Sequence, residues 1–253
     1  MEEISIYELR RIDLKDAIVI DGFPSIGLVS SIVANYLVNA FELEQIGILD
    51  SVHFPPISLI RHSEPLSTVR IYSQEKSWNK REVQLVVFIS EFQPPQSLVK
   101  MIASTMLDWI IDQKCKMLIS PEGLIIEGKG EEGEEKESEA YGVASTKNAR
   151  ELLEQNGIKI FTEGVITGLA GVLLSEGKKR DFDVISILAE AHQQYPDARA
   201  AAKALEVIDK ISLHMRLDPR PLYKEAEIIE AQIKAIQKQA KAVKQVPTPD
   251  MYG

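Results

Sequence analysis

The sequence predicts an α/β protein, a three-layer α/β/α sandwich with a mixed, mostly parallel sheet followed by a C-terminal helical extension. Strand-like apolar runs alternate with helical segments along most of the chain, which is typical of this class. The run Val83–Ser90 is too apolar for either side to face water, so helices are expected on both faces of the sheet. Glycine-rich turns also join two of the strands to helices.

The first half of the chain opens with a strand, a turn and a helix. Ala17–Asp21 predicts a buried strand, Gly22–Gly27 a turn, and Leu28–Phe41 a buried helix because it lacks breakers. Pro94-Pro95 then begins a helix that reaches about Gln113. The other strands expected here are Gln45–Asp50, Ser67–Ser73 and Val83–Ser90, and a hairpin tip at Glu75–Arg81 indicates some antiparallel pairing.

The second half continues this alternation and then becomes helical. Strands are expected at Lys116–Ser120, Ile158–Phe161 and Asp183–Leu188, and helices at Asn148–Gln155, Gly168–Glu176 and Ala198–His214. Residues 1–217 are therefore expected to form one α/β/α domain. Within it, residues 127–139 carry seven acids and two lysines but no apolar side chain, which predicts a mobile acidic loop or, less simply, an acidic contact site.

Residues 218–244 are predicted to form a separate C-terminal helix with an apolar seam. The seam positions alternate in steps of four and three and are Leu222, Ala226, Ile229, Ile233, Ile236, Ala240 and Val243. Such a narrow stripe must be buried, either on its own domain or against a copy of itself. We favour the second and expect a homo-oligomer, because the flanks of the stripe are rich in Lys and Gln.

Composition limits the classes of function. The chain has 253 residues and a net charge of −9, so general nucleic-acid binding is not expected. The single cysteine, Cys115, cannot form an internal disulfide, and neither a signal peptide nor a membrane span is visible. We therefore expect a soluble cytoplasmic protein with no membrane partner.

The two glycine turns are the first candidates for a ligand site. Gly22 and Gly27, with Ser25 between them, have the spacing of a phosphate loop, but the Lys and Ser/Thr that should follow are replaced by Leu28 and Val29. A second turn contains Gly164, Thr167 and Gly168. Each turn could hold an anion weakly at a helix N-terminus, or could serve only to let a helix pack closely on the sheet.

Catalytic and metal chemistry is weakly supported. Glu91 and Glu122 each follow a strand end, where α/β sheets place ligands, and could act as acid and base. No nucleophile or cofactor loop accompanies them, and the four histidines lack metal-ligand spacing. We therefore expect no cofactor, no metal and no catalytic residues; an enzyme acting on a nucleotide or another phosphorylated small molecule is the alternative.

The C-terminal tail is the strongest candidate for partner binding. In residues 245–253, Pro247 and Pro249 forbid a helix and favour an extended segment. It ends in Met251, Tyr252 and Gly253, a hydrophobic residue, a tyrosine and a free carboxylate. Capture of a C-terminal carboxylate is a known mode of peptide recognition. We therefore expect a docking tail.

Several segments together resemble the proteasome assembly chaperone family, the second-chaperone type found in archaea. They are Ile18–Leu37, Gly164–Leu174 and Tyr195–Leu205, and the last three residues resemble the hydrophobic–tyrosine–any motif with which proteasome activators and assembly factors enter pockets between α-subunits. The resemblance implies a fold similar to nucleoside phosphorylases without their catalytic residues, homo-oligomers, and proteasome core α-subunits as the partner. It implies that Met251 fills an apolar spot, Tyr252 packs at the pocket rim, and the Gly253 carboxylate pairs with a pocket lysine.

Overall fold

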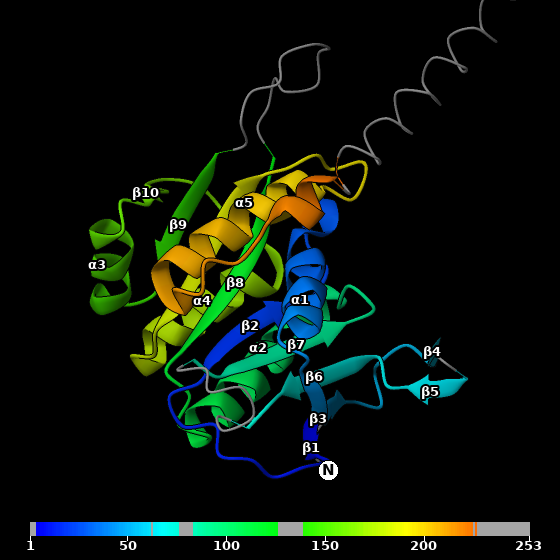
Figure 1. The fold of residues 1–253 in the computed structure, drawn as a ribbon. Coiled ribbons are helices and arrows are strands. Elements are labelled where there is room, and N and C mark those ends of the chain that lie inside the picture. Colours follow the sequence, from blue (N-terminus) through cyan, green and yellow to red (C-terminus); the bar gives the residue numbers. More distant parts are fainter. Residues whose placement is uncertain (1–3, 62, 76–82, 126–138, 225, 227–253) are drawn as a thin grey trace, which may run out of the picture.

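A computed structural model describes residues 4–61, 63–75, 83–125, 139–224 and 226. Helices cover both faces of one nine-stranded sheet, so the predicted three-layer α/β/α sandwich is confirmed (Figure 1). The strand order is β1-β3-β6-β7-β2-β8-β11-β9-β10, and β4 and β5 form a separate hairpin that projects from the body.

The four central strands run parallel and form the centre of the fold. They are β7 (Leu85–Ser90), β2 (Ile18–Gly22), β8 (Met117–Leu124) and β11 (Val184–Glu190). Apart from Leu124, their apolar residues are buried on both faces, which explains the run of apolar residues that each strand contains.

Toward its two edges the sheet changes direction, which makes it mixed. On one side β6 (Val69–Ser73) pairs antiparallel with β7, and β3 (Glu44–Asp50) and β1 (Ser5–Glu8) follow. On the other side β9 (Ala140–Ala144) runs antiparallel to β11 and carries the short β10 (Lys159–Ile160). The separate hairpin consists of β4 (Leu59–Arg61) and β5 (Glu64–Leu66).

Two hydrophobic cores lie on the two faces of the sheet. The first core is covered by α1 (Val29–Ala40), α3 (Lys147–Gln155) and α5 (Ala198–Ile208). The second is covered by α2 (Gln96–Asp112) and α4 (Gly168–Arg180). A 3-10 turn, η1 (Ile26–Leu28), precedes α1, and a π-helical turn, η2 (Asp209–Leu213), ends α5.

The structure differs from the sequence-based prediction in several elements. Strands β1, β4, β5 and β9 were not predicted; all four are short and partly exposed, and the first three also lack a continuous apolar run. The helix predicted over Ala198–His214 changes from α to π geometry at Asp209. The predicted strand Lys116–Ser120 continues to Leu124, so Glu122 lies within a strand instead of after its end.

Part of the predicted organisation lies outside the described residues. This holds for most of the acidic loop 127–139, of which only Glu139 is described, and for most of the predicted hairpin tip 75–81. Within the described part of the chain, no helix has both the length and the apolar character needed to cross a bilayer.

Candidate functional site

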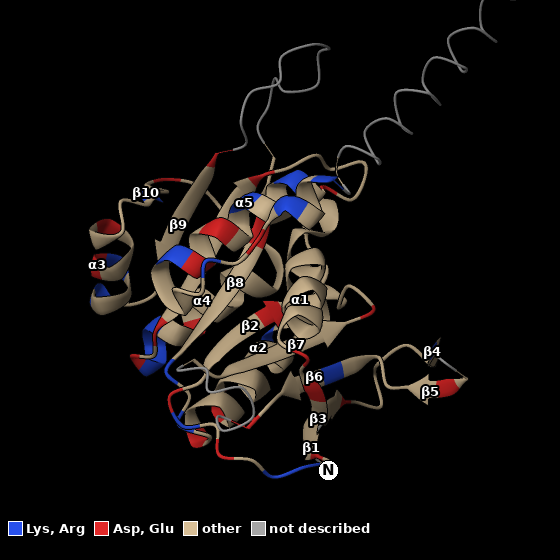
Figure 2. Ribbon diagram, viewed as in Figure 1, with Lys and Arg blue, Asp and Glu red and all other residues tan. Residues whose placement is uncertain are grey.

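Charged residues on the central strands gather at one edge of the sheet. The four strands carry only Asp21, Glu122 and Glu190 as charged residues, and all three lie in the carboxyl half of their strands. Figure 2 shows these strands as almost entirely tan apart from such positions. This carboxyl edge is where open α/β sheets place ligands, so it is the first region to examine for a site.

The first glycine turn is filled by its own chain. A Cβ on Gly22 would lie 2.4 Å from both the Ala34 Cβ and the Phe88 carbonyl oxygen, so only glycine allows α1 to pack this closely. Ser25 Oγ accepts the backbone N–H of Ser30 (3.2 Å) and lies 2.8 Å from the Ser30 hydroxyl. The turn therefore has the features of a close-packing turn, with the Ser25 hydroxyl already engaged.

The start of α5 locks onto the same turn. Gly27 adopts a left-handed φ of 61°, and its carbonyl accepts the backbone N–H of Asp197 at 2.7 Å. Asp197 caps α5 by accepting the N–H of Ala200, and its other oxygen lies 2.7 Å from His192 Nδ1. Two of the segments that carry the family resemblance, 18–37 and 195–205, thus lie in direct contact.

The second glycine turn leads into a helix on the opposite face of the sheet. Gly164, Thr167 and Gly168 are exposed, and α4 follows them onto the second core, whereas α1 follows the first turn onto the first core. A Cβ on Gly171 would lie 2.2 Å from the Ile166 carbonyl oxygen, so this turn too brings backbone close to a helix. The two turns therefore serve different layers.

The two glutamates proposed as an acid–base pair have different partners. Glu91 follows β7 as predicted and forms an ion pair with Arg70, whose side chain is fully buried. Arg70 also donates to the Tyr72 hydroxyl (2.8 Å) and the Ser67 carbonyl (2.7 Å). Glu91 is thus occupied as the counter-ion of a buried arginine.

Glu122 instead interacts with Asp21, a residue that sequence reasoning did not single out. Asp21 is 1% exposed; its carboxylate accepts the Phe23 N–H (3.0 Å) and the Ser120 hydroxyl (2.7 Å). Burial raises the pKa of Asp21 to about 6, against the lowering effect of these two hydrogen bonds. Burial and then the nearby Asp21 hold the pKa of Glu122 well above its usual range.

The buried polar residues around Asp21 form a row across three strands. Ser120 of β8 pairs in register with Ser186 of β11, and both are fully buried. Among the residues that the structure describes, none forms a hydrogen bond with the Ser186 hydroxyl. A single acid in the run Ile18–Gly22 was the one sequence signal for this row, since buried acids need a partner.

Reactive thiol and metal chemistry find little support in the described residues. Burial raises the pKa of the Cys115 thiol to about 12, so this thiol stays protonated at neutral pH. Within the described ranges, no three His, Cys, Asp or Glu side chains are grouped so that they could hold a metal ion.

The first turn of the C-terminal helix is anchored on the first core. Leu222 is 4% exposed and belongs to that core, and Ala226 is 3% exposed. The Tyr223 hydroxyl donates to Glu206 of α5 (2.9 Å), and the Tyr36 hydroxyl of α1 donates to the Asp218 carbonyl (2.8 Å). The first two seam positions are therefore buried within this chain.

The remaining predicted partner-binding residues lie outside the described part of the chain. They are the seam residues Ile229, Ile233, Ile236, Ala240 and Val243 and the tail residues Met251, Tyr252 and Gly253. The oligomer seam and the docking tail therefore stay predictions.

Comparisons with known proteins agree on one family. The structure resembles a crystal structure of Pyrococcus furiosus PbaA, described as an archaeal homolog of proteasome-assembly chaperone, with 29% sequence identity and a TM-score of 0.78 over 96% of this chain and 100% of that chain. It also resembles a crystal structure of Pyrococcus furiosus PbaB, described as an archaeal proteasome activator, with 25% sequence identity and a TM-score of 0.81 over 94% of this chain and 100% of that chain. The uncharacterized protein MJ0106 of Methanocaldococcus jannaschii is 28% identical over 241 residues, covering 94% of this chain and 93% of its own length. A sequence model of the PAC2 family matches residues 19–237, and this chain belongs to the PAC2 family.

Proposed function

We propose that this protein is a proteasome assembly chaperone or activator-like factor that binds the α-ring of the proteasome core. The observation that carries the proposal is the likeness to PbaA and PbaB over nearly the whole chain, because both are described in terms of the proteasome. The second support is the tail, which ends in the hydrophobic–tyrosine–any pattern.

In the proposed mechanism the tail enters a pocket between neighbouring α-subunits. Met251 fills an apolar spot, Tyr252 packs and hydrogen-bonds at the rim, and the carboxylate of Gly253 pairs with a pocket lysine. The anchored first turn of the C-terminal helix, with Leu222 in the core and Tyr223 bonded to Glu206, gives the helix a fixed root from which to present the tail. The proposal takes Gly253 to carry the α-carboxylate of the chain.

We also propose that the seam assembles several copies, so that several weak tails bind one ring together. Linked tails gain avidity because each later binding event is intramolecular. Mass measurement in solution tests this: assembly is expected at micromolar concentration and is expected to be lost in Ile229→Asp/Ile236→Asp. A monomeric parent protein would contradict assembly through the seam.

The carboxyl edge has no catalytic role in this proposal. The protein is proposed to be cytoplasmic and to act on the proteasome core by binding alone. The Ser25 hydroxyl is engaged within its own turn, and Glu91, one of the two glutamates considered as an acid–base pair, balances Arg70. A thermal-shift screen against nucleotides and sugar phosphates tests this point. A large, saturable stabilisation by one of them would favour the enzyme alternative.

The tail mechanism is tested with proteasome cores and free α-subunits from the same organism. Binding of the intact protein is compared with a version lacking Met251–Gly253, with Tyr252→Ala, and with a version extended by one glycine after Gly253. The extension keeps every side chain but moves the carboxylate, so it is the matched control for carboxylate capture. We expect all three changes to weaken binding; equal binding by the intact and truncated proteins would exclude the tail.

A further inference from the structure

The hairpin of β4 and β5 is part of an arm that leaves the body between β3 and β6 (Figure 1). Three large apolar side chains of the arm face the surroundings: Val52 is 86% exposed, Ile57 is 57% exposed and Ile60 is 62% exposed. The root of the arm is fixed, because Phe54 is buried and its ring lies edge-on to that of Phe92, with 5.0 Å between the ring centroids. We call residues 51–61 and 63–68 the hairpin arm.

Strand β4 turns one of its faces toward the body and the other away from it. Arg61 Nη2 lies 3.5 Å from Glu91 Oε1, so the Arg61 side chain points toward the body. Neighbouring residues of a strand point to opposite faces, so Ile60 points away from the body, in agreement with its exposure. The body therefore leaves the Ile60 side chain uncovered.

The two outer edges of the hairpin differ in their backbone groups. Ile60 is the partner of Pro65, and because proline has no N–H these two cannot form a hydrogen-bonded pair of the antiparallel ladder. The N–H and C=O of Ile60 therefore point away from β5, toward the outer edge of β4. On the other edge Pro65 offers no donor, which is one way in which natural edge strands avoid further pairing. The edge of β4 lacks this protection.

The hairpin arm has too few strands for a stable sheet. A two-stranded hairpin is marginally stable in water, and a third strand or a packed helix is needed for independent stability. Each strand of the arm has only three residues, and among the described residues no strand lies beside the outer edge of β4. A strand added to that edge would take up the N–H and C=O of Ile60 and cover its side chain.

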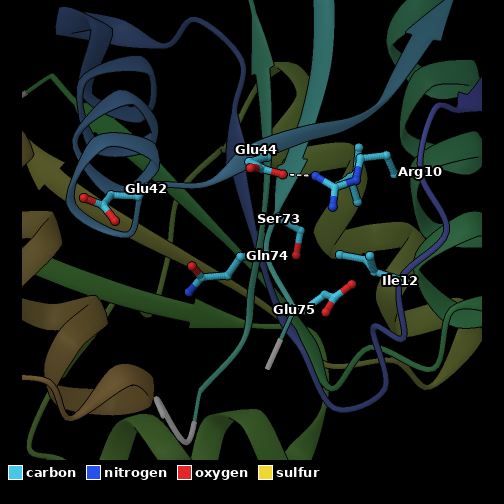
Figure 3. A pocket seen from close by; sticks show the side chains of 8 residues that line it. Arg10, Ile12, Glu42, Glu44, Ser73, Gln74 and Glu75 are labelled. Atoms are coloured by element: carbon cyan, nitrogen blue, oxygen red, sulfur yellow. Dashed lines mark ion pairs between the residues drawn. The ribbon is translucent and has the colours of Figure 1, made fainter. Parts of the chain in front are cut away.

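Charge favours another copy of the chain as the source of that strand. Arg61 and Glu64 are the charged residues of the hairpin arm, so the arm is neutral although the chain carries −9. The opposite ends of β3 and β6 border a pocket of about 190 Å³ whose rim has three carboxylates and one guanidinium, and Figure 3 shows the guanidinium of Arg10 turned toward Glu44. Two acidic chains repel each other least where a neutral surface of each meets the other.

We propose that the hairpin arm joins two copies of this chain edge to edge along β4. The two β4 strands run antiparallel about a two-fold axis at Ile60, so each Ile60 exchanges two hydrogen bonds with its counterpart and the two hairpins form one four-stranded sheet. The described arm is close to the roughly 20 residues that each partner gives to a standard interface. This contact depends on neither the C-terminal seam nor the tail.

Cross-linking of full-length Ile60→Cys with a short bismaleimide tests the pairing of the two strands. The two-fold axis places the new thiols opposite each other, and the native Cys115 is buried. We expect a covalent dimer at micromolar protein. Val165→Cys, at a position that is 84% exposed on the second glycine turn, is the matched control and should stay a single chain. Equal cross-linking of both variants, or of neither, would overturn the proposal.

Sedimentation of the full-length chain measures the strength of the contact, with Ile229→Asp/Ile236→Asp as the background so that the predicted seam does not contribute. We expect dimers to persist in this background. Ile60→Lys opposes two like charges, and Ile60→Pro removes the outward N–H, so each should weaken dimerisation by about tenfold or more. Val165→Lys should leave it unaltered. A monomeric background, or no effect of both Ile60 changes, would refute the contact.

Two further measurements on Ile60→Lys complete the test. Its melting temperature should match that of the parent, because the Ile60 side chain is largely exposed within one chain; if the variant fails to fold, the cross-linking of Ile60→Cys decides. Its binding to proteasome cores identifies the other possible occupant of the arm. A loss of core binding with unchanged self-association would assign the arm to a proteasome subunit and overturn the contact between copies.

Discussion

Replacing Asp21 by Asn is expected to change how stability depends on pH. The folded-state pKa of Asp21, about 6, lies above the ordinary value of 3.8. The folded protein therefore binds this proton more tightly than the unfolded chain does. The associated stabilisation is fully present below about pH 4 and is lost as the pH rises through 6. Asn cannot ionise, so Asp21→Asn should lose this dependence while it still accepts the Phe23 N–H.

The expected size follows from the shift of roughly two pKa units. Between pH 4 and pH 7 the unfolding free energy of Asp21→Asn should rise relative to the parent by about 2.5 kcal/mol, because one unit is worth about 1.4 kcal/mol and part of the effect is already lost at pH 4. Urea unfolding at a series of pH values measures this difference, and pH-independent effects of the substitution cancel in it. Asp112→Asn, at an exposed position of α2, is the control and should show no such trend. A difference that stays constant with pH would refute the raised pKa.

Four other substitutions test the packing described above by equilibrium unfolding. Gly22→Ala should destabilise the protein by about 2–4 kcal/mol, because its Cβ would overlap backbone at 2.4 Å; an unchanged stability would mean that α1 can move away. Ser186→Ala should be neutral or stabilising by up to about 1 kcal/mol, since the described residues offer its hydroxyl no hydrogen-bond partner; a clear loss of stability would contradict this. Glu91→Gln should cost about 2 kcal/mol by leaving the Arg70 charge buried without its carboxylate, and an effect near zero would argue against this pair. Leu222→Ala should lower the unfolding free energy by about 2–4 kcal/mol, because Leu222 is buried in the core; little change would mean that this side chain is exposed to solvent.

The sequence predicts the centre of the fold well and its edges poorly. Strands such as β7 are buried on both faces, so nearly all of their residues are apolar and the sequence shows a continuous apolar run. Strand β9 is short, and four of its five residues are only partly buried, so it depends on pairing with β11 on one side and β10 on the other. The continuation of β8 was missed for a related reason. A proline such as Pro121 normally ends a strand. It is tolerated here because the pairing of β8 with β2 stops at Ile119, and β8 continues beside β11 alone.

The site was less predictable because it depends on which distant residues meet. Glu122 was found in the sequence, but its partner Asp21 lies on a neighbouring strand about a hundred residues earlier, and no spacing rule connects them. Arg70 likewise looks like an ordinary strand residue until its burial against Glu91 is seen. The glycine turns were located correctly, and their packing role became clear only when the atoms that face each missing Cβ were known.

The strand order also has a consequence for how the chain folds. Strand β2 is synthesised early, yet its Ile18 pairs with Leu85 on one side and with Met117 on the other, and both come much later in the sequence. Strand β8 in turn pairs with β11, which is synthesised later still. The two edges of β2 therefore stay without strand partners until much of the chain has been synthesised, although α1 follows β2 directly and can cover one of its faces. Such long-range pairing slows folding, and an uncovered apolar strand can meet other chains in the meantime. We therefore expect the nascent chain of this protein to benefit from protection during synthesis.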